Sequence, residues 1–236
     1  PVSGSHSLIA GLAGAGIAEA GFGVLVGSGI QKILLGLAFS PILGFIGGYL
    51  VMLSIYWIFR RSTRTFVSSI FGKAQMVTAA AMAFSHGSND AQKTMGIITL
   101  AIAVFYDWES RGIAFEVPLW VIILSGATMA VGTYLGGRRV INTLGVRIVK
   151  MRSPHGFAAE MSAATVIEVA SRTGVPVSTT HVITSSILGM GSTVRLSAVR
   201  WGVAKEIIYG WVLTFPVVAL LGAGLYQVMR LVTSGA

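Results

Sequence analysis

Long apolar runs separated by short polar segments dominate the pattern of this sequence. The longest runs cover residues 33–59, 117–135 and 207–232. Each is long enough to cross the hydrocarbon core of a bilayer, which takes about 20 helical residues. Segments 156–173 and 177–192 add either two further crossings or one re-entrant hairpin. We therefore predict an all-α polytopic membrane protein.

Composition agrees with this class and argues against others. Hydrophobic residues make up 54% of the chain and charged residues 11%, with a mean hydropathy of +0.79, whereas soluble domains carry about a quarter charged residues. The net charge of +9 does not indicate a nucleic-acid partner, because the basic residues lie between apolar segments and DNA-binding proteins gather them on a water-facing patch. Cysteine is absent, which excludes a disulfide framework or thiolate site.

Two parts of the chain resemble each other at an offset of 176 − 1 = 175 residues. Residues 1–6 read Pro-Val-Ser-Gly-Ser-His, and residues 176–181 read Pro-Val-Ser-Thr-Thr-His. The match continues without a gap through five pairs, Gly14 with Gly189, Gly16 with Gly191, Gly27 with Gly202, Pro41 with Pro216 and Gly47 with Gly222. We therefore predict a duplication. Residues 1–65 form the C-terminal part of the first repeat, and residues 66–236 form a complete second repeat.

Basic residues indicate how the repeats lie in the membrane, because Lys and Arg accumulate in short cytoplasmic loops. One cluster lies in residues 60–73 and another in residues 138–152, and both are predicted to be cytoplasmic. The acidic loop between them then faces outward. The matched runs 33–59 and 207–232 consequently cross in opposite directions, which predicts an inverted-topology repeat, a signature of secondary transporters. The counterpart of residues 87–90 would precede residue 1, so we expect the front of the first repeat to be missing.

A polar stretch interrupts the apolar run 76–105 and supplies the first candidate site. It contains Ser88, Asn89, Asp90, Gln92, Lys93 and Thr94, and such groups are costly in lipid and usually functional. We expect Gly87 to break the helix here. Oxygens of Asn89, Asp90 and Gln92 then hold a cation, while N–H groups freed at the new helix start, together with Lys93, face an anion. The alternative is a short extramembrane loop with a capped helix start.

The second candidate site begins after Pro176. Ser178, Thr179, Thr180 and His181 precede an apolar helix, and hydroxyls combined with helix N-terminal amides suit the oxygens of a phosphate. The alternative is a capped helix start with a structural histidine. Ser3, Ser5 and His6 occupy the same register in the first repeat. Two such helices related by an in-plane axis give a shared midplane pocket, which favours a binding site.

Isolated ionisable residues extend the candidate set. Glu168 lies in a weakly polar segment and is interpreted either as an ion relay or as an interhelical hydrogen-bond partner; Glu19 is a further candidate. With Asn89 and Asp90, these two residues are the candidates for cation or proton coupling. His86 and Asp90 have the i, i+4 spacing of metal ligands, but no third ligand is evident. His86 is therefore interpreted as structural.

These motifs resemble those of the PiT family of inorganic phosphate transporters, whose halves each carry Gly-x-Asn-Asp and Pro-Val-Ser-Thr-Thr-His. Residues 87–90 and 176–181 match closely, and residues 1–6 match with Gly4 and Ser5 in place of two threonines. The resemblance implies phosphate held between the halves and coupled to sodium or protons, with sodium at Asn89, Asp90 and Ser178. Sodium-coupled members continue Asn-Asp-Val-Ala-Asn, whereas this chain has Lys93 and resembles the bacterial low-affinity branch. Like-charge repulsion from Lys93 favours protons or a neutral metal–phosphate complex.

The predicted function is symport of inorganic phosphate across the cytoplasmic membrane by a multi-pass homodimer, with no cofactor beyond the co-transported H⁺ or Na⁺. A permease for sulfate or another tetrahedral oxyanion is the alternative of the same class. An intramembrane serine hydrolase would use Ser88 or Ser178 with a histidine, but no Gly-x-Ser-x-Gly elbow occurs, so we predict that the protein is not an enzyme. A purely structural membrane subunit is a third interpretation.

Overall fold

The computed structural model describes the backbone of residues 2–234, and within these residues it contains helices and connecting segments but no strand. The long helices are α1 (Gly4–Ala20), α2 (Gly27–Ile58), α3 (Arg64–Phe105), α4 (Leu119–Asn142), α5 (Ser153–Thr173), α6 (Thr179–Val194) and α7 (Trp201–Ser234). Short turns of helix are η1 (Phe22–Val24), η2 (Thr143–Arg147) and η3 (Leu196–Ala198). The predicted all-α class is confirmed.

Among the described residues, three helices are long and apolar enough to cross a membrane: α2, residues Leu119–Arg138 of α4, and Trp201–Thr233 of α7. At about 1.5 Å per residue, the 32 residues of α2 extend about 48 Å, which exceeds a hydrocarbon core of about 30 Å. Many large apolar side chains on these helices are exposed, among them Leu50, Ile123 and Leu220. This outward apolar surface is what a lipid-facing helix requires, and it agrees with the apolar runs of the sequence.

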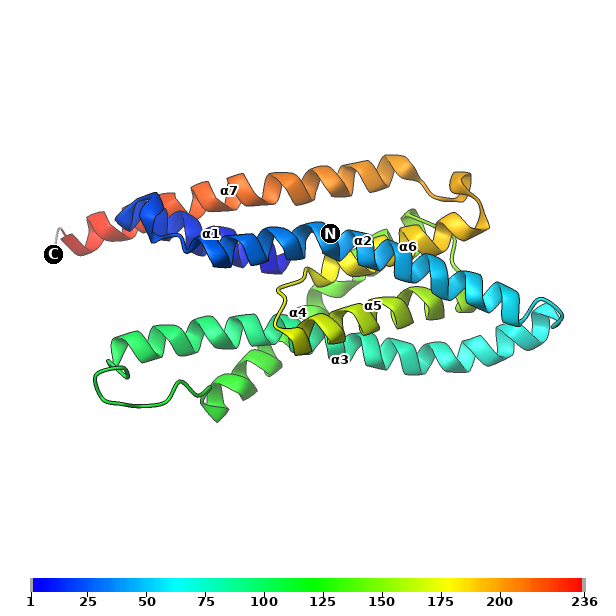
Figure 1. The fold of residues 1–236 in the computed structure, drawn as a ribbon, viewed down its shortest axis with the longest axis horizontal. Helices are drawn as coiled ribbons and strands as arrows, with labels where there is room; N and C mark the ends of the chain where they lie inside the picture. Colours follow the sequence, from blue (N-terminus) through cyan, green and yellow to red (C-terminus); the bar gives the residue numbers. More distant parts are fainter. Residues whose placement is uncertain (1, 235–236) are drawn as a thin grey trace.

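The helices form an elongated bundle of antiparallel and crossing pairs (Figure 1). Helix α1 packs along α7, α2 along α6, and α3 along α5, while α4 contacts mainly α3. Helices α5 and α6 form a hairpin whose connecting segment, residues 174–178, reaches the middle of the bundle. The beginning of α1 and the beginning of α6 are thereby brought together.

The two matched segments have the same local structure. Helix α1, the turn η1 and helix α2 correspond to α6, η3 and α7, and α1 and α6 begin 179 − 4 = 175 residues apart. Each segment places its first helix against the second helix of the other, since α1 packs on α7 and α6 packs on α2. Figure 1 shows α2 and α7 running in opposite directions along the bundle. The contacts are therefore reciprocal between the two segments.

Glycines permit the close approach of these helices. A Cβ on Gly14 would overlap the carbonyl oxygen of Ala219 in α7, and a Cβ on Gly189 would overlap the carbonyl oxygen of Phe45 in α2. Gly14 and Gly189 are equivalent positions of the two segments. Small residues of this kind let membrane helices pack backbone to backbone.

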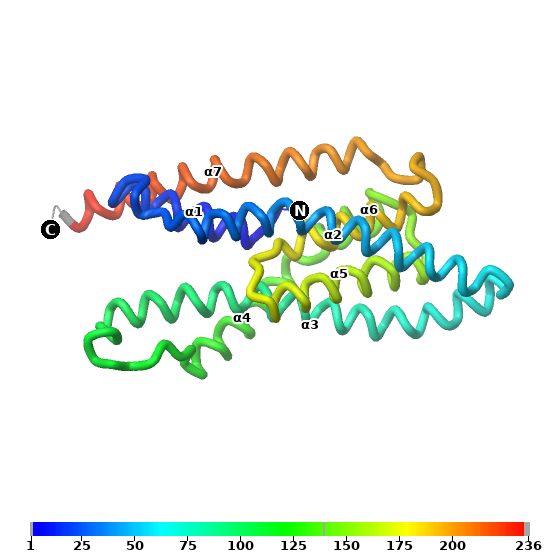
Figure 2. The backbone as a smooth tube through the Cα atoms, in the orientation of Figure 1, coloured from blue at the N-terminus to red at the C-terminus, as the bar shows by residue number. Residues whose placement is uncertain are grey.

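Helix α3 corrects one prediction. It continues without a break from Arg64 to Phe105, through residues 85–94, as the tube in Figure 2 shows. Neither the predicted helix break at Gly87 nor the alternative extramembrane loop is present. The backbone keeps its internal hydrogen bonds, which is the cheaper solution where water is scarce, and the polar side chains find partners on other helices instead. The backbone N–H groups of residues 85–94 are therefore used in hydrogen bonds within α3.

Candidate functional site

The N-termini of α1 and α6 meet at the centre of the bundle. The Ser3 hydroxyl caps α1 by accepting a hydrogen bond from the His6 N–H at 3.2 Å, and the Ser178 hydroxyl caps α6 in the same way with the His181 N–H at 3.2 Å. The Ser178 Oγ also donates to the Ser3 Oγ at 2.8 Å. Both serines are fully buried. Two helix ends with positive partial charge therefore face one another through equivalent residues.

Asp90 links these two helix starts to α3. Its carboxylate accepts hydrogen bonds from the Thr179 hydroxyl at 3.1 Å and from the Ser5 hydroxyl at 3.4 Å. It also lies 3.2 Å from the Lys93 Nζ and 3.3 Å from the His86 Nε2. The carboxylate is thus held by both matched segments, and His86, interpreted from the sequence as structural, is a direct neighbour of the site.

Lys93 uses the oxygens that a sodium ion would need. Its ammonium donates to the Asn89 Oδ1 and to the Asp90 Oδ1, and it reaches the Val177 carbonyl oxygen at 3.4 Å. The Ser178 hydroxyl, the third expected sodium ligand, is directed to Ser3. Within the described residues, no group of three or more His, Cys, Asp or Glu side chains could hold a metal ion. A fixed cation therefore occupies this position.

Two histidines lie behind the serine caps. The rings of His6 and His181 are edge to face with centroids 4.7 Å apart, and His181 stacks on Trp211 at 3.8 Å. Both side chains are almost fully buried, and the Nδ1 of His6 and both ring nitrogens of His181 have no hydrogen-bond partner in the part of the chain that the structure describes. These unpaired groups supply hydrogen-bonding capacity at the point where the two segments meet.

Four expected substrate residues take no part in this network. Gln92 and Thr94 are exposed on α3. Ser88 and Thr180 are half-buried. The structure thus brings together Ser3, Ser5, His6, Asn89, Asp90, Lys93, Ser178, Thr179 and His181.

The two glutamates expected to couple transport lie apart from the network. Glu168 forms an ion pair with Arg172, one turn further along α5, at 2.8 Å, so its partner is on its own helix and not on a neighbouring one. Glu19 is exposed near the end of α1. Neither carboxylate contacts Asp90 in this conformation.

Two supporting residues were not foreseen from the sequence. The Ser40 hydroxyl in α2 accepts from the Ser178 N–H at 3.2 Å, and the Ser171 hydroxyl in α5 accepts from the Asn89 amide at 2.7 Å. Single serines in apolar helices look like packing residues. The only sequence signal for Ser40 is its neighbour Pro41, which marks a matched position of the repeat.

Residues 1–222 match the model of the phosphate transporter family. A protein of Rhizobium meliloti (strain 1021) named "Probable low-affinity inorganic phosphate transporter" is 43% identical over 98% of this chain and 69% of its own length. A protein of the same name from Bacillus subtilis (strain 168) is 41% identical over the same shares.

A solved structure titled "The sodium-dependent phosphate transporter" matches with a TM-score of 0.81 and 25% identity. The match covers 98% of this chain and 74% of that one. The fold, the family model and the relatives agree with one another over nearly the whole sequence. This chain belongs to the phosphate transporter family.

Proposed function

We propose that the chain binds inorganic phosphate where the N-termini of α1 and α6 meet, and that it carries phosphate across the cytoplasmic membrane as a symporter. The observation that carries this proposal is the 2.8 Å contact between the capping hydroxyls of Ser3 and Ser178. Two helix N-termini aimed at one point, with hydroxyls beside them, form an anion site of the kind that helix dipoles and backbone amides create.

The charges of the site bear on what accompanies phosphate. Asp90 and Lys93 neutralise one another at 3.2 Å, and each helix N-terminus contributes about half a positive charge. The positive charge of the two helix N-termini therefore roughly neutralises a singly charged phosphate ion. The second negative charge of a phosphate dianion needs one further cation, because an uncompensated charge is costly in the membrane interior. This balance supports the transport of at least one cation with each dianion.

Lys93 favours a proton over sodium as that cation. Its ammonium already contacts the Asn89 and Asp90 oxygens that would otherwise ligate sodium. A sodium ion at the same oxygens would meet like-charge repulsion within a few ångströms. We therefore propose proton coupling, with the neutral metal–phosphate complex as a second form of the substrate that also avoids an excess charge.

The two matched segments supply a moving part for alternating access. Their reciprocal packing, α1 on α7 and α6 on α2, supports an inverted-topology repeat whose halves rock around the contact of Ser3 with Ser178. The basic ends at residues 60–73 and 138–152 would face the cytoplasm. In this arrangement the α5–α6 hairpin is re-entrant and delivers Ser178 to membrane depth.

The test is uptake of radiolabelled phosphate into liposomes under imposed gradients. We expect an inward proton gradient to drive accumulation in sodium-free buffer, and sulfate in tenfold excess to compete weakly. Measurements with and without Mg²⁺ separate free phosphate from the metal complex. Accumulation that requires sodium would overturn proton coupling. Competition by sulfate as strong as that by unlabelled phosphate would show that the protein transports tetrahedral oxyanions in general.

A further inference from the structure

A cationic cavity lies at one end of the bundle, far from the candidate site. It has a volume of about 900 Å³ and lies between the end of α2, the start of α3 and the start of α5. Arg64 is 26 residues before Asp90 in α3, which corresponds to about 39 Å along the helix. This cavity, here called the terminal basic pocket, is therefore separate from the phosphate site proposed above.

The walls of the terminal basic pocket carry positive charge without compensation. Arg60, Arg64 and Arg152 line it with several hydroxyl groups, and no Asp or Glu is among the lining residues. Within the described residues, none of these arginines forms an ion pair. Helices α3 and α5 begin here without an acidic residue in the first turn, so two helix N-termini add to the positive potential.

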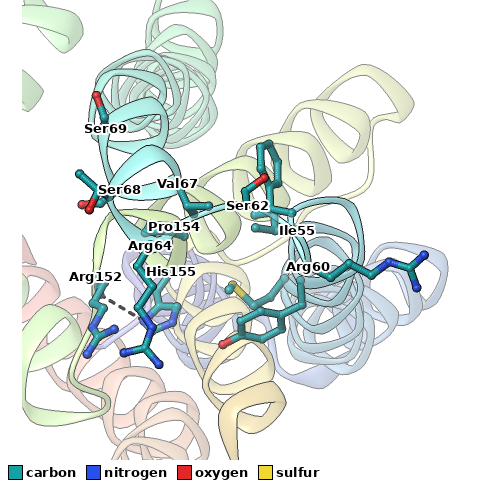
Figure 3. A pocket seen from close by; sticks show the side chains of 14 residues that line it. Ile55, Arg60, Ser62, Arg64, Val67, Ser68, Ser69, Arg152, Pro154 and His155 are labelled. Atoms are coloured by element: carbon teal, nitrogen blue, oxygen red, sulfur yellow. Dashed lines mark hydrogen bonds between the residues drawn. The ribbon is translucent and has the colours of Figure 1, made fainter.

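The side chains are arranged unevenly around the cavity. In Figure 3, Arg64 and Arg152 extend to the same side beside His155, whereas Arg60 extends away from them. The Arg60 guanidinium instead lies 5.8 Å from the ring centroid of Trp57. Arg64 and Arg152 therefore form the pair that can hold an anion between them.

His155 can add a hydrogen-bond donor to this pair. Its Nδ1 accepts from the Arg152 backbone N–H at 3.2 Å, so a neutral ring carries its hydrogen on Nε2. Burial and then the Arg152 guanidinium lower the pKa of His155, while a hydrogen bond to the Lys150 backbone opposes them; the net shift of the pKa is downward, which keeps the ring neutral at pH 7. Two guanidinium groups with an imidazole donor suit phosphate oxygens.

The remaining lining residues and the position of the pocket identify the ligand class. Met52, Ile55 and Phe59 form an apolar wall, and the apolar run of α2 ends at Phe59, directly before Arg60. The pocket therefore lies where hydrocarbon gives way to headgroups. Its volume also far exceeds that of a free phosphate ion. We propose that the terminal basic pocket binds an anionic phospholipid, with the headgroup phosphate between Arg64 and Arg152 and an acyl chain along the apolar wall.

The first test follows the reactivity of individual arginines in the purified protein in detergent. Phenylglyoxal modifies exposed arginines, and peptide mass spectrometry reports each residue. Short-chain phosphatidylglycerol is expected to slow modification of Arg64 and Arg152 about tenfold at about ten times its Kd, and to leave Arg60 unchanged. Short-chain phosphatidylcholine, which has no net charge, is the matched control and should have little effect.

The second test removes the cationic pair. Arg64→Gln/Arg152→Gln should lose selective retention of phosphatidylglycerol over phosphatidylcholine during purification, whereas Arg60→Gln should keep it. Equal protection of all three arginines would indicate charge screening alone and would overturn the proposal. Protection by inorganic phosphate as strong as that by phosphatidylglycerol would also overturn it, because the occupant would then be a soluble anion. Phosphate uptake by liposomes tests the transport site independently of either result.

Discussion

The ion pair of Asp90 with Lys93 offers a quantitative test of the site. The two groups are 3.2 Å apart, and each side chain is 19% exposed to solvent. At an effective dielectric constant of about 20, two unit charges at this distance attract by about 5 kcal/mol, part of which is offset by desolvation. Removing one partner of a buried pair costs about 3–5 kcal/mol, because the other charge is left unpaired.

A double-mutant cycle measures this coupling. We expect Asp90→Asn and Lys93→Met each to lower the free energy of unfolding in mixed micelles by about 3 kcal/mol. The double variant should recover at least about 2 kcal/mol relative to the sum of the single changes. Equilibrium denaturation followed by circular dichroism provides the measurement.

The pair of Glu168 with Arg172 is a matched control in the same protein. Its atoms are closer, at 2.8 Å, but the arginine side chain is 79% exposed, and exposed pairs of this kind contribute only about 0.3–0.5 kcal/mol. The cycle of Glu168→Gln and Arg172→Met should therefore show little coupling. If the Asp90–Lys93 coupling is no larger than this control, the two charges are not held together in the protein interior and the reasoning fails.

Three further outcomes are expected. Gly189→Ala should destabilise the protein by about 1–3 kcal/mol through overpacking, whereas Gly96→Ala, with no atom near the added methyl group, should not lower the Tm. Ser178→Ala should lower the free energy of unfolding by about 1 kcal/mol because the helix cap is lost, which is measured as a lower Tm. It should also reduce phosphate uptake; full uptake would show that the Ser178 hydroxyl is not part of the phosphate site. Lys93→Ala should free the oxygens of Asn89 and make uptake more sensitive to sodium, which a flat sodium titration would contradict.

Much of the fold was predictable from the sequence, because lipid imposes simple rules. The apolar runs at 33–59, 117–135 and 207–232 correspond to the three helices that can cross a membrane. The offset of the matched motifs reappears in the starts of α1 and α6, where Ser3 and Ser178 are both helix caps. Caps and apolar length are local properties, so they can be inferred without tertiary structure.

The unbroken path of α3 was not predictable from local chemistry. A glycine followed by polar residues indicates a break, but the break is unnecessary when partners lie on other helices. The Asn89 amide donates a hydrogen bond to Ser171, and the Asp90 carboxylate accepts hydrogen bonds from Thr179 and Ser5. These partners are more than 80 residues away in the sequence, and only the packing of α3 on α1, α5 and α6 reveals them. The same reason explains why Ser40 was missed.

The most direct test of the account is phosphate binding by a variant that alters one hydroxyl at the meeting point of α1 and α6. Thr179→Val keeps the side-chain shape but removes the hydroxyl, which donates its hydrogen to Asp90 at 3.1 Å in this structure and must turn that donation to phosphate when the anion binds. Loss of a hydrogen bond to a charged group is worth about 1.5–3 kcal/mol, so equilibrium dialysis with radiolabelled phosphate should give a Kd raised about tenfold or more. Thr128→Val, whose hydroxyl bonds only to carbonyl oxygens of α4, should leave the Kd unchanged. Equal Kd values for Thr179→Val and the unmodified protein would place phosphate elsewhere and contradict the account.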